Sequence, residues 1–105
     1  MKLVWLKESE EDIQRLFDFL FEKSPEAADK AIGSILEKSE LLREVPEIGH
    51  LMQDDTGRRE LIIPFGAGAY VLRYYILKDC VAIVRVWHSR EITGRAIGSQ
   101  YFRLS

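Results

Sequence analysis

Cysteine is almost absent from this chain, because Cys80 is the single cysteine among 105 residues. A lone cysteine excludes an internal disulfide and fits a reducing compartment such as the cytoplasm. Long apolar runs are absent too, since no stretch approaches the roughly 20 residues that a membrane-spanning helix needs. The apolar stretch at residues 3–6 is too short for the core of a signal peptide. These features predict a cytoplasmic protein without membrane contact.

Few residues are suited to metal or covalent chemistry. His50, His88 and Cys80 are too few and too scattered for a zinc site. The Gly-Ala-Gly segment at residues 66–68 lies between two predicted strands rather than before a helix, which favours a turn over a phosphate-binding loop. No Gly-x-Ser-x-Gly or Cys/His arrangement indicates covalent catalysis. We therefore expect neither a bound metal nor a cofactor.

Charge is divided unevenly along the chain. Residues 1–57 have a net charge of −7 and residues 58–105 a net charge of +5, and seven of the eight cations in the second part are arginine. Arginine binds phosphates and carboxylates with two parallel hydrogen bonds. The division predicts an acidic helical scaffold with a basic working surface. The alternative is that the two parts neutralise each other in the folded chain.

Two helices are predicted after a short candidate strand at residues 2–6. Ser9 is expected to cap the first helix, whose apolar residues recur at helical spacing: Ile13, Leu16, Phe17 and Leu20. Ser24 and Pro25 are typical of a second helix start, and this helix should run to about Glu44. Gly33 is expected to let the two helices approach closely. The short connection predicts an antiparallel helical hairpin.

Three strands are predicted in the second half, at residues 58–64, 69–77 and 80–88. Lys78-Asp79 is a plausible two-residue turn that would place Leu72 opposite Arg85 and Tyr74 opposite Ile83. Because no linker or repeat interrupts the chain, we expect one domain over residues 1–105. Its class is α+β, with an N-terminal strand and a helical hairpin packed on a mostly antiparallel four-stranded sheet, in the order β-α-α-β-β-β.

Four segments, in this order and spacing, carry a resemblance to a known family. They are Val45-Pro46-Glu47-Ile48-Gly49, Arg59-Glu60-Leu61, Tyr70-Val71-Leu72-Arg73-Tyr74-Tyr75 and Ile83-Val84-Arg85-Val86-Trp87-His88-Ser89-Arg90-Glu91. Together they resemble the RelE/ParE superfamily of toxin–antitoxin systems over nearly the whole chain. The resemblance implies a toxin that a cognate antitoxin protein binds and blocks, as a homodimer or a heterotetramer with the antitoxin.

The superfamily divides in mechanism, and the resemblance favours its ParE-like branch. ParE-like toxins poison DNA gyrase, whereas RelE-like toxins cut messenger RNA in the ribosome. The slightly acidic chain lacks the basic excess that RNA binding favours. Ala96 also stands where RelE-like nucleases often carry a tyrosine, and residues 45–64 contain no lysine. A third reading is a non-toxic interaction module of the same fold.

The candidate site residues are mostly arginines. Arg90 matches an arginine of RelE-like nucleases, and His88 could act as acid or base if the chain is a nuclease. The residues expected to bind a target or partner are Arg59, Arg73, Arg85, Arg90 and Arg95, with the tail at residues 92–105. Two alternatives stay open: a structural hydrogen bond made by His88 at the strand end, and internal ion pairs formed by the mid-strand Arg73 and Arg85.

Overall fold

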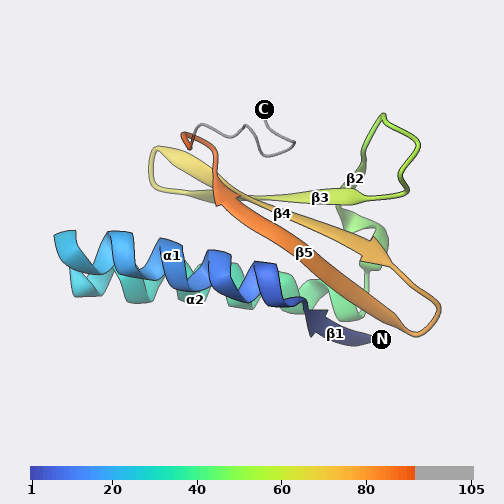
Figure 1. Cartoon of the computed structure of the whole chain (residues 1–105), viewed down its shortest axis with the longest axis horizontal. Coiled ribbons are helices and arrows are strands. Elements are labelled where there is room, and N and C mark those ends of the chain that lie inside the picture. The colour runs from blue at the N-terminus through green and yellow to red at the C-terminus, as the bar shows by residue number, and fades with distance from the viewer. Residues whose placement is uncertain (92–105) are drawn as a thin grey trace.

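The structure is a computed structural model that describes residues 1–91. Its elements are β1 (Lys2–Trp5), α1 (Lys7–Lys23), α2 (Pro25–Ser39), the 3₁₀ helices η1 (Glu40–Arg43) and η2 (Pro46–Ile48), β2 (His50–Leu51), β3 (Arg59–Phe65), β4 (Gly68–Ile76) and β5 (Cys80–His88). The five strands form one sheet in the order β1-β5-β4-β3-β2. The helical hairpin covers one face of this sheet (Figure 1).

The predicted α+β class and the mostly antiparallel sheet are confirmed. Only β1 and β5 run parallel, and the pairs β2–β3, β3–β4 and β4–β5 are antiparallel. The strand count of four is wrong, because the segment between the second helix and β3, where no strand was predicted, contains β2. This strand has two residues, paired with Arg59 and Glu60 of β3. Two residues are too few for an alternating pattern to reveal in the sequence.

The helix starts show one error and one success. The first helix begins at Lys7, and Ser9 does not cap it: its hydroxyl donates to the Leu6 carbonyl at 2.6 Å. The helix starts early because the Leu6 N–H extends the β1–β5 pairing by donating to the Ile83 carbonyl at 3.0 Å. The Ser24 cap is confirmed, since its hydroxyl accepts from the Ala27 N–H at 3.2 Å.

The two helices and the sheet share one apolar core. Its fully buried residues are Ala31, Ile35 and Leu42 on the helical side and Ile63, Leu72, Tyr74, Val81, Ile83 and Val86 on the sheet side. Gly33 lies outside this core, and a Cβ built there would meet no atom within 4 Å. The expected close approach of the helices at Gly33 is therefore wrong. The second helix also ends at Ser39, and η1 continues it to Arg43.

The turn of the β4–β5 hairpin was predicted correctly, but only one of the two predicted residue pairs across the strands is right. The Leu77 N–H donates to the Cys80 carbonyl at 2.8 Å across Lys78-Asp79, and Tyr74 pairs with Ile83 as expected. A bulge then shifts the register, so that Leu72 faces Val86 instead of Arg85. One extra residue in a strand changes every later pairing, and no pattern in the sequence marks its place.

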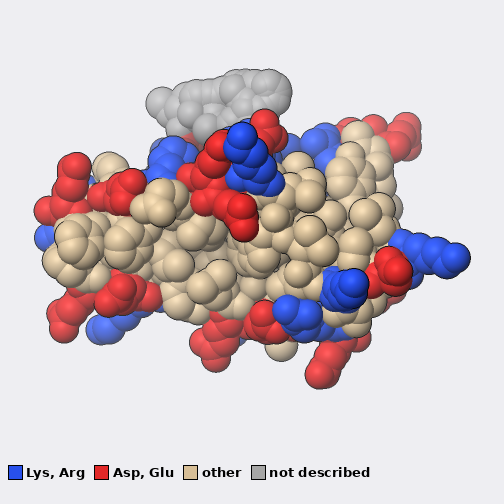
Figure 2. Space-filling model, turned by 60° about the horizontal axis from the view of Figure 1, so that its bottom comes forward, with Lys and Arg blue, Asp and Glu red and all other residues tan. Residues whose placement is uncertain are grey.

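The helical layer leaves apolar side chains exposed on its outer side. Figure 2 shows a broad uncharged area along this side, with charged residues gathered at its margins. Phe21 of α1 and Leu36 of α2 are each about half exposed, and the centroids of the Phe21 and Phe17 rings lie 5.5 Å apart. No helix among residues 1–91 combines the length and the apolar character needed to cross a membrane.

Candidate functional site

Side chains of α1 complete the free edge of β5. The pairing of β1 with β5 ends at Trp5 and Ile83, so the edge of β5 beyond that point has no neighbouring strand among residues 1–91. The buried carboxylate of Asp12 accepts from the Val86 N–H at 2.9 Å, and Arg15 donates to the Val86 carbonyl at 3.2 Å. Two side chains of one helix thus replace a missing strand.

Asp12 also holds Arg85 of β5. The Arg85 guanidinium meets the two carboxylate oxygens at 2.7 and 3.1 Å, and Arg15 adds a further contact to Asp12 at 3.1 Å. The hydrogen bond to Asp12 raises the pKa of Arg85, against the opposing effect of burial. Of the two readings left open for Arg85, the structure shows the internal ion pair. It also shows one way in which the acidic and basic parts of the chain neutralise each other.

The guanidinium groups of Arg73 and Arg59 are engaged as well. Arg73 donates to the Glu60 carboxylate at 2.7 and 3.0 Å and lies over the Trp87 ring, 4.8 Å from its centroid. Arg59 donates to the carbonyls of Glu47 and Gly49 at 3.2 and 2.8 Å. These bonds hold the sheet and the loop before β2 together. Arg95 and the tail at residues 92–105 lie outside the described residues.

The end of β5 brings His88 and Arg90 together in one tight turn. The His88 Nδ1 accepts from the backbone N–H of Arg90 at 3.0 Å, so the structural hydrogen bond considered for His88 is present. Glu91 accepts from the His88 N–H at 2.7 Å and pairs with Arg15. The guanidinium of Arg90 makes no hydrogen bond or ion pair within residues 1–91, and the side chain is exposed.

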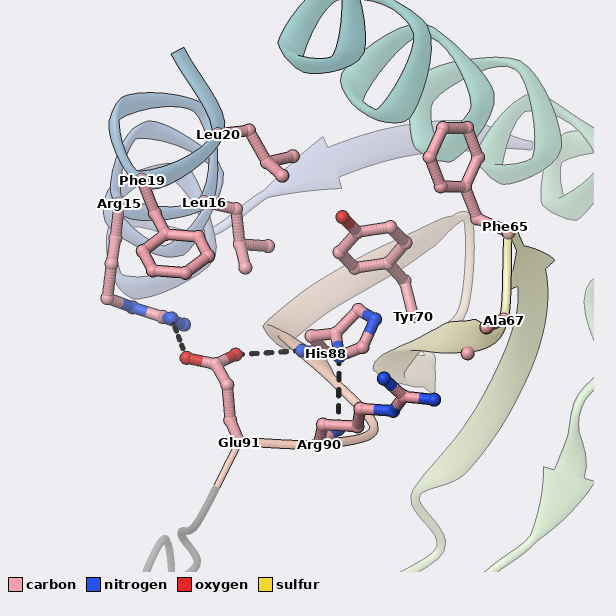
Figure 3. A pocket seen from close by; sticks show the side chains of 12 residues that line it. Arg15, Leu16, Phe19, Leu20, Phe65, Ala67, Tyr70, His88, Arg90 and Glu91 are labelled. Atoms are coloured by element: carbon pink, nitrogen blue, oxygen red, sulfur yellow. Dashed lines mark hydrogen bonds and ion pairs between the residues drawn. The ribbon is translucent and has the colours of Figure 1, made fainter. Parts of the chain in front are cut away.

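A pocket of about 680 Å³ opens beside this turn, between α1, the β3–β4 hairpin and the end of β5 (Figure 3). Its lining residues are Arg15, Leu16, Phe19, Leu20, Phe65, Gly66, Ala67, Gly68, Tyr70, His88, Arg90 and Glu91. The predicted turn at residues 66–68 is confirmed, with Gly66 at a positive φ of 60°. Gly68 packs on His88, because a Cβ there would lie 2.8 Å from the imidazole ring.

Two predicted candidate residues, His88 and Arg90, line this pocket. Arg15, Phe19 and Tyr70 also line it, and Asp12 binds Arg15 beside it, but none of these four was predicted as a site residue. One signal was available: Asp12 lies four residues before the buried Leu16, so it shares the inner face of α1. A carboxylate on a buried face requires a cationic or N–H partner.

Tyr70 and Tyr74 are both buried, but their hydroxyls have different surroundings. The Tyr74 hydroxyl donates to the Pro46 carbonyl at 2.6 Å and accepts from the Gly49 N–H at 2.9 Å. The Tyr70 side chain is 3% exposed, and its hydroxyl makes no hydrogen bond to any other group of residues 1–91. Burial raises the pKa of both, and the Glu91 carboxylate raises the pKa of Tyr70 further.

Replacing each tyrosine by phenylalanine should separate these two surroundings. Tyr74→Phe leaves a buried N–H and a buried carbonyl without a partner, so we expect it to lower the free energy of unfolding by about 2 kcal/mol at pH 7. Tyr70→Phe removes a hydroxyl that has no protein partner. It should therefore change the free energy of unfolding by less than about 1 kcal/mol. Urea denaturation measures both values. Equal losses in the two variants would contradict this assignment.

The same variants should differ from the parent chain at high pH. A raised pKa means that the folded state favours the protonated tyrosine, so this stability is fully present below the unfolded pKa near 10. It is lost as the pH rises through the folded-state pKa. The stability of the parent chain should therefore fall more steeply above pH 10 than that of either variant, when urea denaturation is repeated across this range.

Comparison with known proteins agrees with this fold and chain order. A family model described as the ParE toxin of the type II toxin–antitoxin system parDE matches residues 3–93. Toxin RelE3 of Caulobacter vibrioides is 39% identical over 80 residues, which cover 76% of this chain and 85% of the relative. Toxin RelE1 of the same organism is 41% identical over 81 residues, which cover 76% and 84%.

A solved structure from the chromosomal ParDE toxin–antitoxin system of P. aeruginosa has the same fold. It is 22% identical, has a TM-score of 0.70 and covers 84% of this chain and 95% of that chain. The helical hairpin on a mostly antiparallel sheet is thus an α+β fold that this structure shares. The chain belongs to the ParE toxin family, within the RelE/ParE superfamily of type II toxin–antitoxin systems.

Proposed function

We propose that this chain is a ParE-like toxin, which arrests growth in the cytoplasm by binding a cellular target such as DNA gyrase and is neutralised by a cognate antitoxin. The observation that carries this proposal is the state of the predicted arginines. Arg59, Arg73 and Arg85 are bound to internal carbonyls and carboxylates. Among the candidate arginines in the described part of the chain, only Arg90 presents an unengaged guanidinium to solvent.

One accessible arginine suits recognition better than hydrolysis of RNA. Cleavage without a metal needs a base, an acid and cations around the charged phosphorane. Here the Nδ1 of His88 already accepts from the Arg90 N–H, so it is not available to take a proton from a substrate. An exposed arginine, by contrast, is a frequent anchor of a protein–protein interface once a partner buries it.

A RelE-like ribosome-dependent endoribonuclease is the second candidate. It is favoured by the closeness of His88 and Arg90 in one turn and by the names of the relatives from Caulobacter vibrioides. In that case Arg90 would stabilise the phosphate and the Nε2 of His88 would transfer the proton. An antitoxin partner is common to both candidates and is supported by the ParDE system of P. aeruginosa, whose toxin shares this fold.

Controlled expression in a bacterium with a DNA-damage reporter tests the proposal. We expect growth arrest with the reporter switched on, because a poisoned gyrase leaves broken DNA. Growth arrest with a silent reporter would point to the ribosome, and mapping of messenger RNA ends would then identify cleavage. Soluble, folded protein without any arrest would contradict both candidates and leave the interaction module.

Arg90→Ala is expected to abolish most of the growth arrest without unfolding the chain. Loss of a buried interface arginine costs about 2 kcal/mol, which corresponds to more than a tenfold loss of target affinity. Arg43→Ala is the matched control, because the Arg43 side chain pairs, within the described residues, only with the neighbouring Glu40 of η1. Colony counts after induction measure the effect, and circular dichroism checks the fold. Full growth arrest by Arg90→Ala would exclude Arg90 from the target-binding site.

A further inference from the structure

The pocket beside the His88–Arg90 turn contains a polar group that the fold leaves unused. Tyr70 is almost completely buried, and Figure 3 shows its hydroxyl pointing into the space between Leu16, Leu20 and Phe65. No group of residues 1–91 bonds to this hydroxyl. A buried hydroxyl without a protein partner costs free energy, so this group calls for a partner from outside the fold, such as a water molecule or a ligand atom.

The walls of the pocket are suited to an apolar group of aromatic size. Leu16, Leu20, Phe65 and the ring of Tyr70 face the space, and its volume of about 680 Å³ exceeds that of one aromatic side chain. Phe19 stands at the rim with 61% of its surface exposed. The apolar surface therefore continues outward from the pocket, which suits a segment of chain better than a free small molecule.

The charges at the rim favour an anion next to the apolar group. The Glu91 carboxylate is engaged by Arg15 and by the His88 N–H, and the Asp12 carboxylate by Arg85 and Val86. These bonds leave the guanidinium of Arg90 as the rim charge without a partner in the described residues. A carboxylate that enters above the pocket would meet this guanidinium and form a charge-assisted hydrogen bond.

We infer that this pocket is an anchor site for the antitoxin, which inserts a tyrosine-like side chain, with an apolar body and a polar tip, beside an acidic residue. The tip hydroxyl would bond to the Tyr70 hydroxyl, the ring would pack on Leu16, Leu20 and Phe65, and the carboxylate would meet Arg90. That the inserted side chain comes from the antitoxin rests on the proposed function. That the pocket binds a tyrosine-like side chain beside a carboxylate rests on the pocket residues alone.

N-acetyl-L-tyrosine is a probe of this chemistry, because it joins a ring, a hydroxyl and a carboxylate. Titrated into the full isotope-labelled chain, it should shift the NMR signals of residues 65–70 and 88–91, with a Kd on the order of 1 mM. N-acetyl-L-phenylalanine lacks only the hydroxyl and should bind about fivefold more weakly. In Tyr70→Phe the two probes should bind equally well. Equal binding to the parent chain, or shifts elsewhere, would overturn the inference.

Two surface phenylalanines of α1 provide a matched pair of variants that should keep the fold. Phe19→Ser removes an apolar side chain from the rim of the pocket. It should weaken the binding of N-acetyl-L-tyrosine about threefold or more, because an apolar contact is lost. Phe21→Ser is the control, since Phe21 is similarly exposed and does not line the pocket. Equal effects of the two substitutions would contradict a role for the pocket rim.

The source of the occupant is tested with the complex formed on co-expression with the protein encoded by the neighbouring gene. If the antitoxin fills the pocket, N-acetyl-L-tyrosine should no longer shift the signals of Tyr70 and His88 in the complex. Probe binding that is unchanged in the complex would overturn the antitoxin as occupant. None of these titrations depends on growth arrest, so a failure of the proposed function would leave their outcome intact.

Discussion

Asp12→Ala is expected to lower the free energy of unfolding by about 3 kcal/mol, the lower end of the cost of breaking a buried ion pair. The Asp12 side chain is 5% exposed and serves Arg85, Arg15 and the Val86 N–H together. Its removal leaves a cation and a backbone N–H without their partner. The lower end applies because the Arg85 side chain is 36% exposed, so water recovers part of the loss.

Urea denaturation and thermal unfolding measure this effect. For a chain of this size, a loss of about 3 kcal/mol corresponds to a fall in Tm of about 15 °C. Asp18→Ala is the control on the same helix, because Asp18 is exposed and accepts a hydrogen bond only from Gln14 among residues 1–91. We expect a change within about 0.5 kcal/mol for this control. Similar losses in the two variants would show that Asp12 does not organise the edge of β5.

The ion pair should also appear as coupling between the two residues. In a double-mutant cycle, Arg85→Ala should lower the free energy of unfolding less in the Asp12→Ala background than in the parent chain. The coupling energy between the two residues should be about 1–3 kcal/mol. Because the pair is partly buried, this coupling should persist at high salt, unlike that of an exposed pair. Additive losses would mean that Asp12 acts through Val86 and Arg15 instead.

The parts of the fold that sequence reasoning reached are those with a local cause. Ser24 and Pro25 start α2 through atoms that lie within three residues, and Lys78-Asp79 closes the β4–β5 hairpin between adjacent strands. The same local reasoning placed Ser9 wrongly. The helix start there is decided by β5, through the hydrogen bond from the Leu6 N–H to the Ile83 carbonyl.

The candidate site could be predicted only where one short segment contains it. His88 and Arg90 lie two residues apart, so their closeness in the folded chain could be predicted from the sequence. The pairing of Arg85 with Asp12 spans 73 residues, and the pocket joins α1 to the β3–β4 hairpin. Helical spacing places Asp12 on the inner face of α1, but it does not identify Arg85 as the partner, because the two residues meet only in the folded chain.

Gly49→Ala should be about as damaging as the loss of Asp12, for a reason of space rather than backbone conformation. Gly49 has an extended backbone with φ −77°, which any residue adopts. A Cβ there would lie 2.5 Å from the Tyr74 hydroxyl and 2.8 Å from the Glu60 carbonyl oxygen. Both neighbours are held in place, because Tyr74 is fully buried and Glu60 belongs to β3.

We therefore expect Gly49→Ala to lower the free energy of unfolding by about 3 kcal/mol, from overpacking and from the weakened bond between the Gly49 N–H and Tyr74. Gly33→Ala is the matched control with the opposite sign. Gly33 lies in mid-helix with open space around its Cβ position. The Gly33→Ala substitution should therefore raise the free energy of unfolding by about 0.5–1 kcal/mol. Urea denaturation of the two variants measures this difference. A stable Gly49→Ala variant would mean that the loop before β2 can move away from Tyr74, which would contradict its role as the anchor of that loop.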